Sequence, residues 1–335
     1  MTKLPISVII LTYNEEKNIE ACLKSVAGWV KEIFVVDSYS TDRTLDIVGN
    51  YTDNVFQHSF ENYSKQRNWA LRNLPIETEW VLNLDSDHRV SLELKNELQK
   101  VFLNGLDDSL NGFLISRKTI FMDKWIKRGG HYPAYHSILF KKDAGFCEDR
   151  LYDQHFVVEG ELKYLAGTVI DIITDSLTNF IHRHNKWATF EAMEFLTKES
   201  ISSEKKIKPD ILGHAIQRRR FLRTSYNRLP LFVRPFLYFT YRYFFRLGFL
   251  EGREGLIFHF LQGFWYRFLV DAKIYEIQKR AKVENRNVSD VIYELYGIEA
   301  GRGGEGIRGG EEEIRDSWRW EKRRLEIHRD YKNRD

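Results

Sequence analysis

Residues 81–90 read VLNLDSDHRV, a stretch that joins the pattern of a buried strand to a pair of acids. Val81, Leu82 and Leu84 are typical of a strand in a packed sheet, whereas Asp85 and Asp87 follow it one residue apart. Carboxylates at the end of an apolar strand lose favourable hydration unless a partner neutralises them. The stretch therefore predicts a sheet with a charged binding site at one end of this strand.

The chain from residue 5 to about residue 115 alternates apolar strands with amphipathic helices. Strands are predicted at residues 6–11, 32–37, 54–60 and 79–87, and helices at residues 14–30, 40–51 and 61–74. This alternation predicts an α/β fold with a mostly parallel sheet that helices cover on both faces. Ligands of such sheets bind beyond the carboxyl ends of the strands.

The remainder of the chain departs from that alternation. Residues 112–121, 137–142 and 156–165 have the pattern of antiparallel or mixed strands that extend the sheet, and residues 177–200 that of a helix. We therefore expect a catalytic-type domain over residues 1–200, a helical, basic and aromatic region over 201–298, and a tail over 299–335. The tail is glycine-rich and then densely charged, so we expect it to be flexible.

Composition limits the possible classes of protein. The chain has 335 residues, 43% of them apolar, and a formal net charge of +3, which gives no reason to expect a nucleic-acid partner. Cys22 and Cys147 are far apart and too few for a disulfide framework or a zinc site, so we expect both in the core of a cytoplasmic protein. The N-terminal apolar run is too short for a signal peptide and reads as the first strand.

Polar side chains follow the predicted parallel strands and should meet at one rim of the sheet. They are Thr12, Tyr13, Asn14 and Glu15 after the first strand, Asp37 and Ser40 after the second, and Asp85, Ser86 and Asp87 after the fourth. Lys65 and Arg67 start the third helix. Acids, an aromatic ring and cations together suit a nucleotide diphosphate with Mg²⁺ or Mn²⁺, which Asp85 and Asp87 would bind. Each of these polar motifs alone could be structural, for example a solvated turn or a helix N-cap. The prediction therefore depends on their order along the alternating strands.

Four segments resemble the successive signatures of family 2 glycosyltransferases with the GT-A fold, which are inverting enzymes with nucleotide-sugar donors. The segments are SVIILTYNEEKNIEACLKSV (7–26), EIFVVDSYSTDRT (32–44), SKQRNWAL (64–71) and WVLNLDSD (80–87). RGGHYPAYHSILFKK (128–142) and the basic, aromatic C-terminal region resemble bacterial glucosyltransferases of the lipopolysaccharide core.

This resemblance implies roles for single residues. Residues 12–15 and Asp37 would hold the base and ribose, with Arg67 near the nucleotide. Asp85 would contact ribose or metal, and Asp87 would bind the metal directly. The family often has glycine at Tyr39, which puts the local backbone there in question. His88 replaces an acid common in relatives, and it either joins the surroundings of the metal or faces solvent.

Inverting transfer needs a carboxylate that removes the proton of the acceptor hydroxyl. In the resembled family this base follows the irregular middle segment, here FCEDRLYDQHFVVEG (146–160). Glu148-Asp149 spells the family's Glu-Asp motif, whereas alignment of the following strand puts Asp153-Gln154 at the catalytic position. We favour Asp153 over Asp149 and Glu148, and the alternative is that these acids merely line a loop.

Several residues are candidates for binding the acceptor or the diphosphate: Arg117, Trp125, Gly130, Gln154, His155, His184 and Trp187. Residues 180–192, FIHRHNKWATFEA, occupy the place where processive relatives carry Gln-x-x-Arg-Trp. That motif is not intact, so we expect transfer of a single sugar. The alternative for this segment is an amphipathic helix with Trp187 packed inward.

Residues 218–277 are rich in aromatic side chains, but charged residues interrupt every stretch long enough to span a bilayer. Lys and Arg beside Phe, Tyr and Trp suit a helix in the headgroup layer. We therefore expect a cytoplasmic enzyme bound peripherally to the inner face of the plasma membrane. A second core or a dimer contact is the alternative.

The predicted function is inverting, metal-dependent transfer of one sugar from a nucleotide sugar, expected to be a UDP-hexose, to a hydroxyl. The acceptor would be a lipid-linked, lipopolysaccharide or other cell-surface glycan. A sugar-nucleotide nucleotidyltransferase is a second reading, although that class needs a glycine-rich phosphate loop where this chain has LTYNEE (11–16). A third reading is a non-catalytic, membrane-associated scaffold with the same fold.

Overall fold

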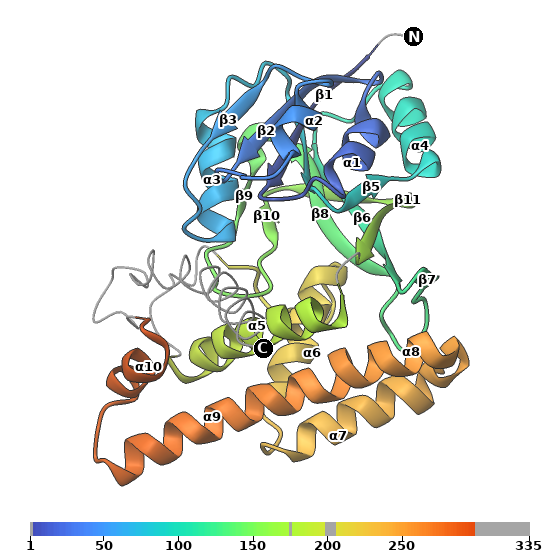
Figure 1. Ribbon diagram of the computed structural model, residues 1–335. Helices are drawn as coiled ribbons and strands as arrows, with labels where there is room; N and C mark the ends of the chain where they lie inside the picture. Colours follow the sequence, from blue (N-terminus) through green and yellow to red (C-terminus); the bar gives the residue numbers. More distant parts are fainter. Residues whose placement is uncertain (1–2, 174–175, 198–205, 299–335) are drawn as a thin grey trace, which may run out of the picture.

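A mixed sheet forms the centre of the computed structural model, which describes residues 3–173, 176–197 and 206–298 (Figure 1). The strands run in the order β3-β2-β1-β4-β8-β6-β11-β5, with β7 paired to β6. Their bounds are β1 Leu4–Thr12, β2 Val30–Asp37, β3 Val55–Gln57, β4 Trp80–Asp85, β5 His88–Val90, β6 Leu110–Phe121, β7 Lys124–Trp125, β8 Ala134–Lys141 and β11 Glu161–Ile173. The pairs β3-β2, β2-β1, β1-β4 and β6-β11 are parallel, which confirms the predicted α/β class.

Helices cover both faces of this sheet and create two cores. They are α1 Ile19–Val26, α2 Thr44–Val48, α3 Tyr63–Asn73 and α4 Leu92–Leu103. Apolar side chains of α1 and α4 pack with one face of the sheet, and those of α3 with the other. The side chain of Asn62 caps α3 by accepting from the Lys65 amide, which starts the helix beside the end of β4. Cys22 and Cys147 are both free and buried, as predicted.

A helical region lies below the sheet in the view of Figure 1. Its elements are α5 Leu177–Thr197, α6 Ala215–Asn227, α7 Val233–Thr240, η3 Tyr241–Phe245, η4 Gly248–Glu251, α8 Gly252–Phe258, η5 His259–Trp265, α9 Tyr266–Val283 and α10 Val288–Tyr296. Helix α5 packs along α9, with Ala188 and Ala192 against Tyr266 and Ile274. The small residues of α5 allow the two helices to approach closely.

Several expected elements are longer than those observed. The first helix covers Ile19–Val26 rather than residues 14–30, the second Thr44–Val48 rather than 40–51, and the third strand Val55–Gln57 rather than 54–60. Residues 198–200 of the expected helix 177–200 lie outside the described residues. The expected tail, residues 299–335, lies outside the described residues, and the domain boundaries remain predictions. No helix among the described residues is long and apolar enough to cross a membrane.

The minor strands complete the environment of the site. β9 Gly145–Cys147 and β10 Phe156–Val158 form a short antiparallel ribbon, with η1 Lys142–Ala144 before it. The loop between β9 and β10, residues 148–155, carries the three acids considered as the base. Figure 1 shows this loop between the sheet and the helical region.

Candidate active site

Two carboxylates and an imidazole gather immediately after β4. One ligand atom each of Asp85, Asp87 and His88 lies within 4.8 Å of the others. The pairing of β11 with β5 puts Asp171 opposite His88, and Asp171 also faces Thr119 on β6. Sheet register thus adds a third acid to the pair that the sequence predicted.

Arg67 is the residue that fixes Asp85. Its side chain is fully buried and donates to the Asp85 carboxylate at 2.5 Å and to the Leu84 and Ile9 carbonyls at 2.7 and 3.2 Å. Burial acts to raise the pKa of Asp85, but the Arg67 charge and hydrogen bond bring it below its ordinary value. Arg67 therefore lies beneath the acid and supports it, and its guanidinium is closed off from solvent.

Asp87 has the opposite electrostatic environment. Burial raises the pKa of its carboxyl well above the ordinary value, and the nearby charges of Asp171, Asp85 and Glu15 raise it further. A divalent cation would relieve this crowding of oxygen ligands, so the residues fit Mg²⁺ or Mn²⁺. Sequence reasoning missed Asp171, although an acid inside the apolar run LAGTVIDII (165–173) was a signal.

His88 supports the two acids from within the fold. The ring is buried, which excludes the solvent-facing alternative, and burial lowers its pKa. Its Nδ1 accepts from the Asp85 amide at 3.1 Å, so the neutral ring carries its proton on Nε2. Nε2 faces Asp85 and Asp87 at 3.7 and 3.9 Å. With that proton in place, Nε2 would face a metal ion as a donor and could not coordinate it.

The loops after β1 and β2 bind each other. The Asn14 amide donates to Ser40 Oγ at 2.8 Å, and the Thr41 amide donates to Asn14 Oδ1 at 2.8 Å. Asp37 is fully buried and accepts from the amide and hydroxyl of Ser40. Tyr39 has a φ of 62°, so it adopts the left-handed conformation in which relatives often place glycine. The predicted nucleotide-binding loops are therefore preformed.

The other predicted donor-site residues lie at the same rim. Thr12 is buried at the end of β1, and its Oγ1 has no hydrogen-bond partner among the described residues. Tyr13 is partly exposed, and Ser86 is buried between the two acids. The Glu15 side chain accepts from Asn18 at the start of α1, which brings its charge toward Asp87. The structure thus brings the predicted donor-site residues together.

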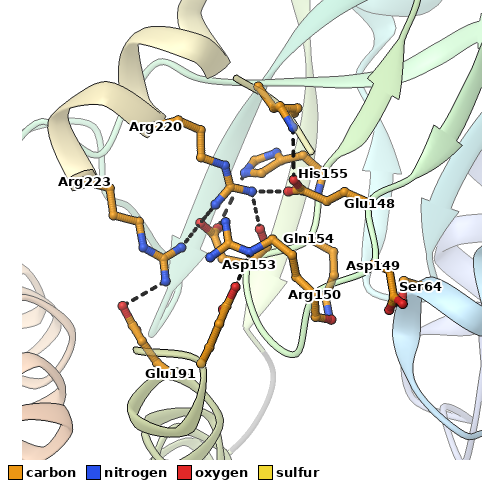
Figure 2. Close-up of polar contacts among 12 residues, drawn as sticks. Ser64, Glu148, Asp149, Arg150, Asp153, Gln154, His155, Glu191, Arg220 and Arg223 are labelled. Atoms are coloured by element: carbon orange, nitrogen blue, oxygen red, sulfur yellow. Dashed lines mark hydrogen bonds and ion pairs between the residues drawn. The ribbon is translucent and has the colours of Figure 1, made fainter. Parts of the chain in front are cut away.

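Asp153, the favoured base, is tightly paired in Figure 2. Its carboxylate accepts from Arg223 at 2.6 Å and from Arg220 at 3.2 Å, and His155 lies 3.5 Å away. Burial acts to raise the pKa of Asp153, but His155, Arg223 and Arg219 hold it well below the ordinary value. A carboxylate neutralised in this way is a weak proton acceptor.

Glu148 and Asp149 have contrasting environments one residue apart. Glu148 is 1% exposed, pairs with Arg220 and accepts from the His155 amide at 2.9 Å, while burial raises its pKa. Asp149 is exposed. Among the described residues, the Ser64 hydroxyl is its one hydrogen-bond donor, at 3.1 Å. Ser64 lies next to Tyr63, whose hydroxyl donates to Asp85 at 3.1 Å. Asp149 thus has the fewest contacts of the three acids, and Figure 2 shows it beside Ser64, apart from the arginines that surround Asp153.

Residues 7–150 match the model of glycosyl transferase family 2. This part of the chain is a family 2 glycosyltransferase domain. The match covers β1 to β4 and the loop with Asp149, so it includes the rim described above. The class of enzyme predicted from the four sequence signatures is confirmed.

The relatives that the chain resembles include two glycosyltransferases. An uncharacterized glycosyltransferase of Rickettsia bellii is 34% identical over 145 residues, which are 42% of this chain and 48% of that protein. The match therefore spans about half of that relative. The lipopolysaccharide core biosynthesis glycosyltransferase LpsC of Rhizobium meliloti is 27% identical over 298 residues, which are 87% of this chain and 98% of that protein.

Among solved structures, the chain is similar to the mannosyltransferase of Pyrobaculum calidifontis in complex with GDP-Man and Mn²⁺. The match covers 82% of this chain and 88% of that chain, at 15% identity and a TM-score of 0.45.

Arg117 connects the two ends of the glycosyltransferase site. Its Nε lies 3.5 Å from Asp171. Burial acts to lower the pKa of Arg117, but Asp171, Asp85, Asp87 and Asp153 raise it. The acids after β4 and Asp153 of the 148–155 loop therefore all act on the pKa of this one arginine.

Trp125 and Gly130 lie on the segment that joins β6 to β8. The Trp125 ring faces Lys118 at 4.5 Å and Lys127 at 5.4 Å, and its Nε1 is buried without a hydrogen-bond partner among the described residues. Gly130 has a φ of 66°. The neighbouring Gly129 approaches η5, because a Cβ there would lie 2.2 Å from His259. The glycines thus serve packing within the chain.

The remaining acceptor candidates are more buried than expected. His155 is 4% exposed beside Asp153, and the Gln154 side chain donates to the Arg150 carbonyl at 2.6 Å. His184 Nδ1 donates to the Phe180 carbonyl, 2.8 Å away, and the two rings lie 3.9 Å apart at their centroids; burial lowers the pKa of His184 to about 4. Trp187 is partly buried against the α5–α9 core. The amphipathic-helix alternative therefore describes α5 better than a ligand site at His184.

Proposed function

We propose that this chain transfers a single sugar, with inversion, from a UDP-hexose to a hydroxyl of a lipid-linked or lipopolysaccharide-type glycan. The observation that carries the proposal is the crowding of Asp87 by Asp85 and Asp171 at the end of β4, which calls for a divalent cation. The relation to LpsC over 87% of the chain supports the acceptor class.

Asp87 and the free oxygen of Asp85 would hold Mg²⁺ or Mn²⁺, because Arg67 and Tyr63 occupy Asp85 Oδ1. The cation would stabilise the negative charge of the departing diphosphate. Preformed loops from β1 and β2 would receive the nucleoside, although both Asp37 oxygens already accept hydrogen bonds within the chain. The donor would thus bind across the rim of the sheet.

We assign the base to Asp149 in preference to Asp153. The Asp149 carboxylate would take the proton of the acceptor hydroxyl while that oxygen bonds to the anomeric carbon. The bond from the anomeric carbon to the diphosphate oxygen breaks, and UDP leaves with the electron pair. Asp149 is exposed for contact with an acceptor, whereas Asp153 is held by Arg220 and Arg223.

A donor panel tests the proposed function directly. The purified chain with Mn²⁺ should release UDP from one UDP-hexose, and release should increase when a glycan acceptor is added. Release should stop with EDTA and return with Mn²⁺. Release that is insensitive to EDTA would contradict the metal-dependent reaction, and formation of pyrophosphate would favour the nucleotidyltransferase.

We also propose peripheral membrane binding through an aromatic face on α7, η3, η4 and η5. We define this face by its exposed members Phe236, Leu237, Tyr241, Phe244, Phe245, Phe249, Leu250 and Phe260. Figure 1 shows that α7 lies on the side of the molecule remote from the sheet. Large exposed apolar patches of this kind mark sites of protein or membrane contact.

Replacement of Phe244 and Phe245 by serine should weaken binding to vesicles of anionic phospholipid by about tenfold, because two aromatic side chains leave the bilayer interface. Cosedimentation measures this change. Leu103→Ser on α4 is the matched control, since Leu103 is 85% and Phe245 75% exposed. Equal binding of both variants would refute this surface as the membrane contact.

A further inference from the structure

A polar cavity of about 370 Å³ lies among α5, α6 and α9, apart from the Asp85–Asp87 rim. Its cationic lining is Arg150, Arg223, Arg228, Arg234 and Arg267. Its acidic lining is Glu191, Glu194 and Asp271. Figure 2 shows three of the lining residues, Arg150, Arg223 and Glu191, close to Asp153 of the 148–155 loop. Five arginines thus face three carboxylates in a partly enclosed space.

Four of the five arginines form ion pairs with carboxylates of the described residues: Arg150 with Glu194, Arg234 with Asp271, and Arg223 and Arg267 with Glu191. Glu191 is shared by Arg223 at 2.9 Å and Arg267 at 2.8 Å, and it also accepts from the Tyr266 hydroxyl at 2.6 Å. Arg228 is exposed and forms no ion pair with any residue that the structure describes. Positive potential in a concave site attracts and concentrates anions.

Two buried oxygen atoms in the lining lack hydrogen-bond partners within the described part of the chain. They are Tyr226 OH and Glu194 Oε2. Buried polar atoms usually bond to protein or ordered water, so these atoms are available to hydroxyl groups of a ligand. Phe195 and Val270 give the cavity an apolar wall beside these atoms. This combination of cations, two hydrogen-bonding oxygens and an apolar wall suits a sugar that carries a phosphate.

We propose that this cavity binds a phosphorylated sugar unit of the acceptor, with its phosphate on Arg228 and its hydroxyls on Tyr226 and Glu194. The volume is within the usual range for small-ligand sites, about 300–1,000 Å³. The cavity adjoins the catalytic loop, because Arg223 binds both Glu191 in its wall and Asp153. The assignment of this ligand to the acceptor rests on the proposed function, whereas the binding of a sugar phosphate is inferred from the cavity alone.

The test measures thermal unfolding of the full chain in EDTA, without donor, so that the metal-binding rim takes no part. A hexose 6-phosphate at about ten times its Kd should raise the unfolding midpoint by about 2 °C, and the unphosphorylated hexose should not. Arg228→Gln should raise the Kd about tenfold, because a charge-assisted contact to phosphate is lost. Tyr226→Phe should raise it about threefold. Arg218→Gln, an exposed arginine of α6 outside the cavity, is the matched control and should bind as the wild type does.

Three results would overturn the inference. These are equal responses of Arg228→Gln and Arg218→Gln, equal stabilisation by inorganic phosphate and by the hexose phosphate, and a response to anionic vesicles without one to the soluble sugar phosphate. Asp87→Asn separates the two proposals: retained hexose phosphate binding in this variant supports the cavity, whatever the outcome for transfer. Loss of that binding in Asp87→Asn would place the ligand at the rim and refute the cavity site.

Discussion

Asp87→Asn should lower the rate of sugar transfer by about a thousandfold or more. The proposed cation stabilises the departing diphosphate, and Asp87, whose carboxylate lies close to other negative charges, is its main proposed ligand. The metal-free variant should be more stable than the wild type by about 1 kcal/mol, since a half-buried carboxylate close to the charges of Asp85 and Asp171 is replaced by a neutral amide. Steady-state transfer assays and denaturant unfolding in EDTA measure the two effects.

The effect of Mn²⁺ on unfolding distinguishes a metal-binding role of Asp87 from a purely structural one. Mn²⁺ should raise the unfolding midpoint of the wild type and leave that of Asp87→Asn almost unchanged. Asp108→Asn serves as the control, because Asp108 is an exposed acid in the turn before β6. Substantial transfer activity in Asp87→Asn, or an equal Mn²⁺ response in both proteins, would remove Asp87 from the metal site.

Asp149→Asn should lower kcat by about 10²–10⁴-fold with little change in donor affinity, because the base acts on the acceptor proton and not on the nucleotide. The substitution should leave the unfolding free energy nearly unchanged, since Asp149 is exposed and its hydrogen bond to Ser64 can be kept by the amide oxygen. Donor binding by calorimetry and single-turnover transfer measure both expectations.

Asp153→Asn is the contrasting variant. It leaves Arg220 and Arg223 short of a carboxylate partner, so the unfolding free energy should fall by about 3 kcal/mol. Transfer should decline in step with the folded fraction. If Asp153→Asn instead folds normally and loses kcat while Asp149→Asn stays active, the base is Asp153 and the preference from sequence was correct.

The comparison of these acids shows where sequence reasoning reached its limit. The segment 146–160 supplied all three candidates, but the preference for Asp153 took no account of Arg220 and Arg223, which lie 67 and 70 residues away on α6. Likewise, Arg67 was identified as a site residue, yet its position beneath Asp85 depends on packing of α3 against β1 and β4. The sequence left open whether His88 faces solvent, because the burial of a side chain depends on residues that are distant in the chain.

The sequence alone determined the α/β class and the place of Asp85 and Asp87, because strand and helix periodicity is local and the carboxyl ends of parallel strands share one rim. It also determined that residues 218–277 form a charged, aromatic region. Tertiary structure decided which acids are free. Sheet register put Asp171 opposite His88, and packing of the helical region neutralised Asp153 and formed the arginine-lined cavity. These results depend on contacts between distant residues, which fix burial and charge pairing and leave no periodic signal in the chain.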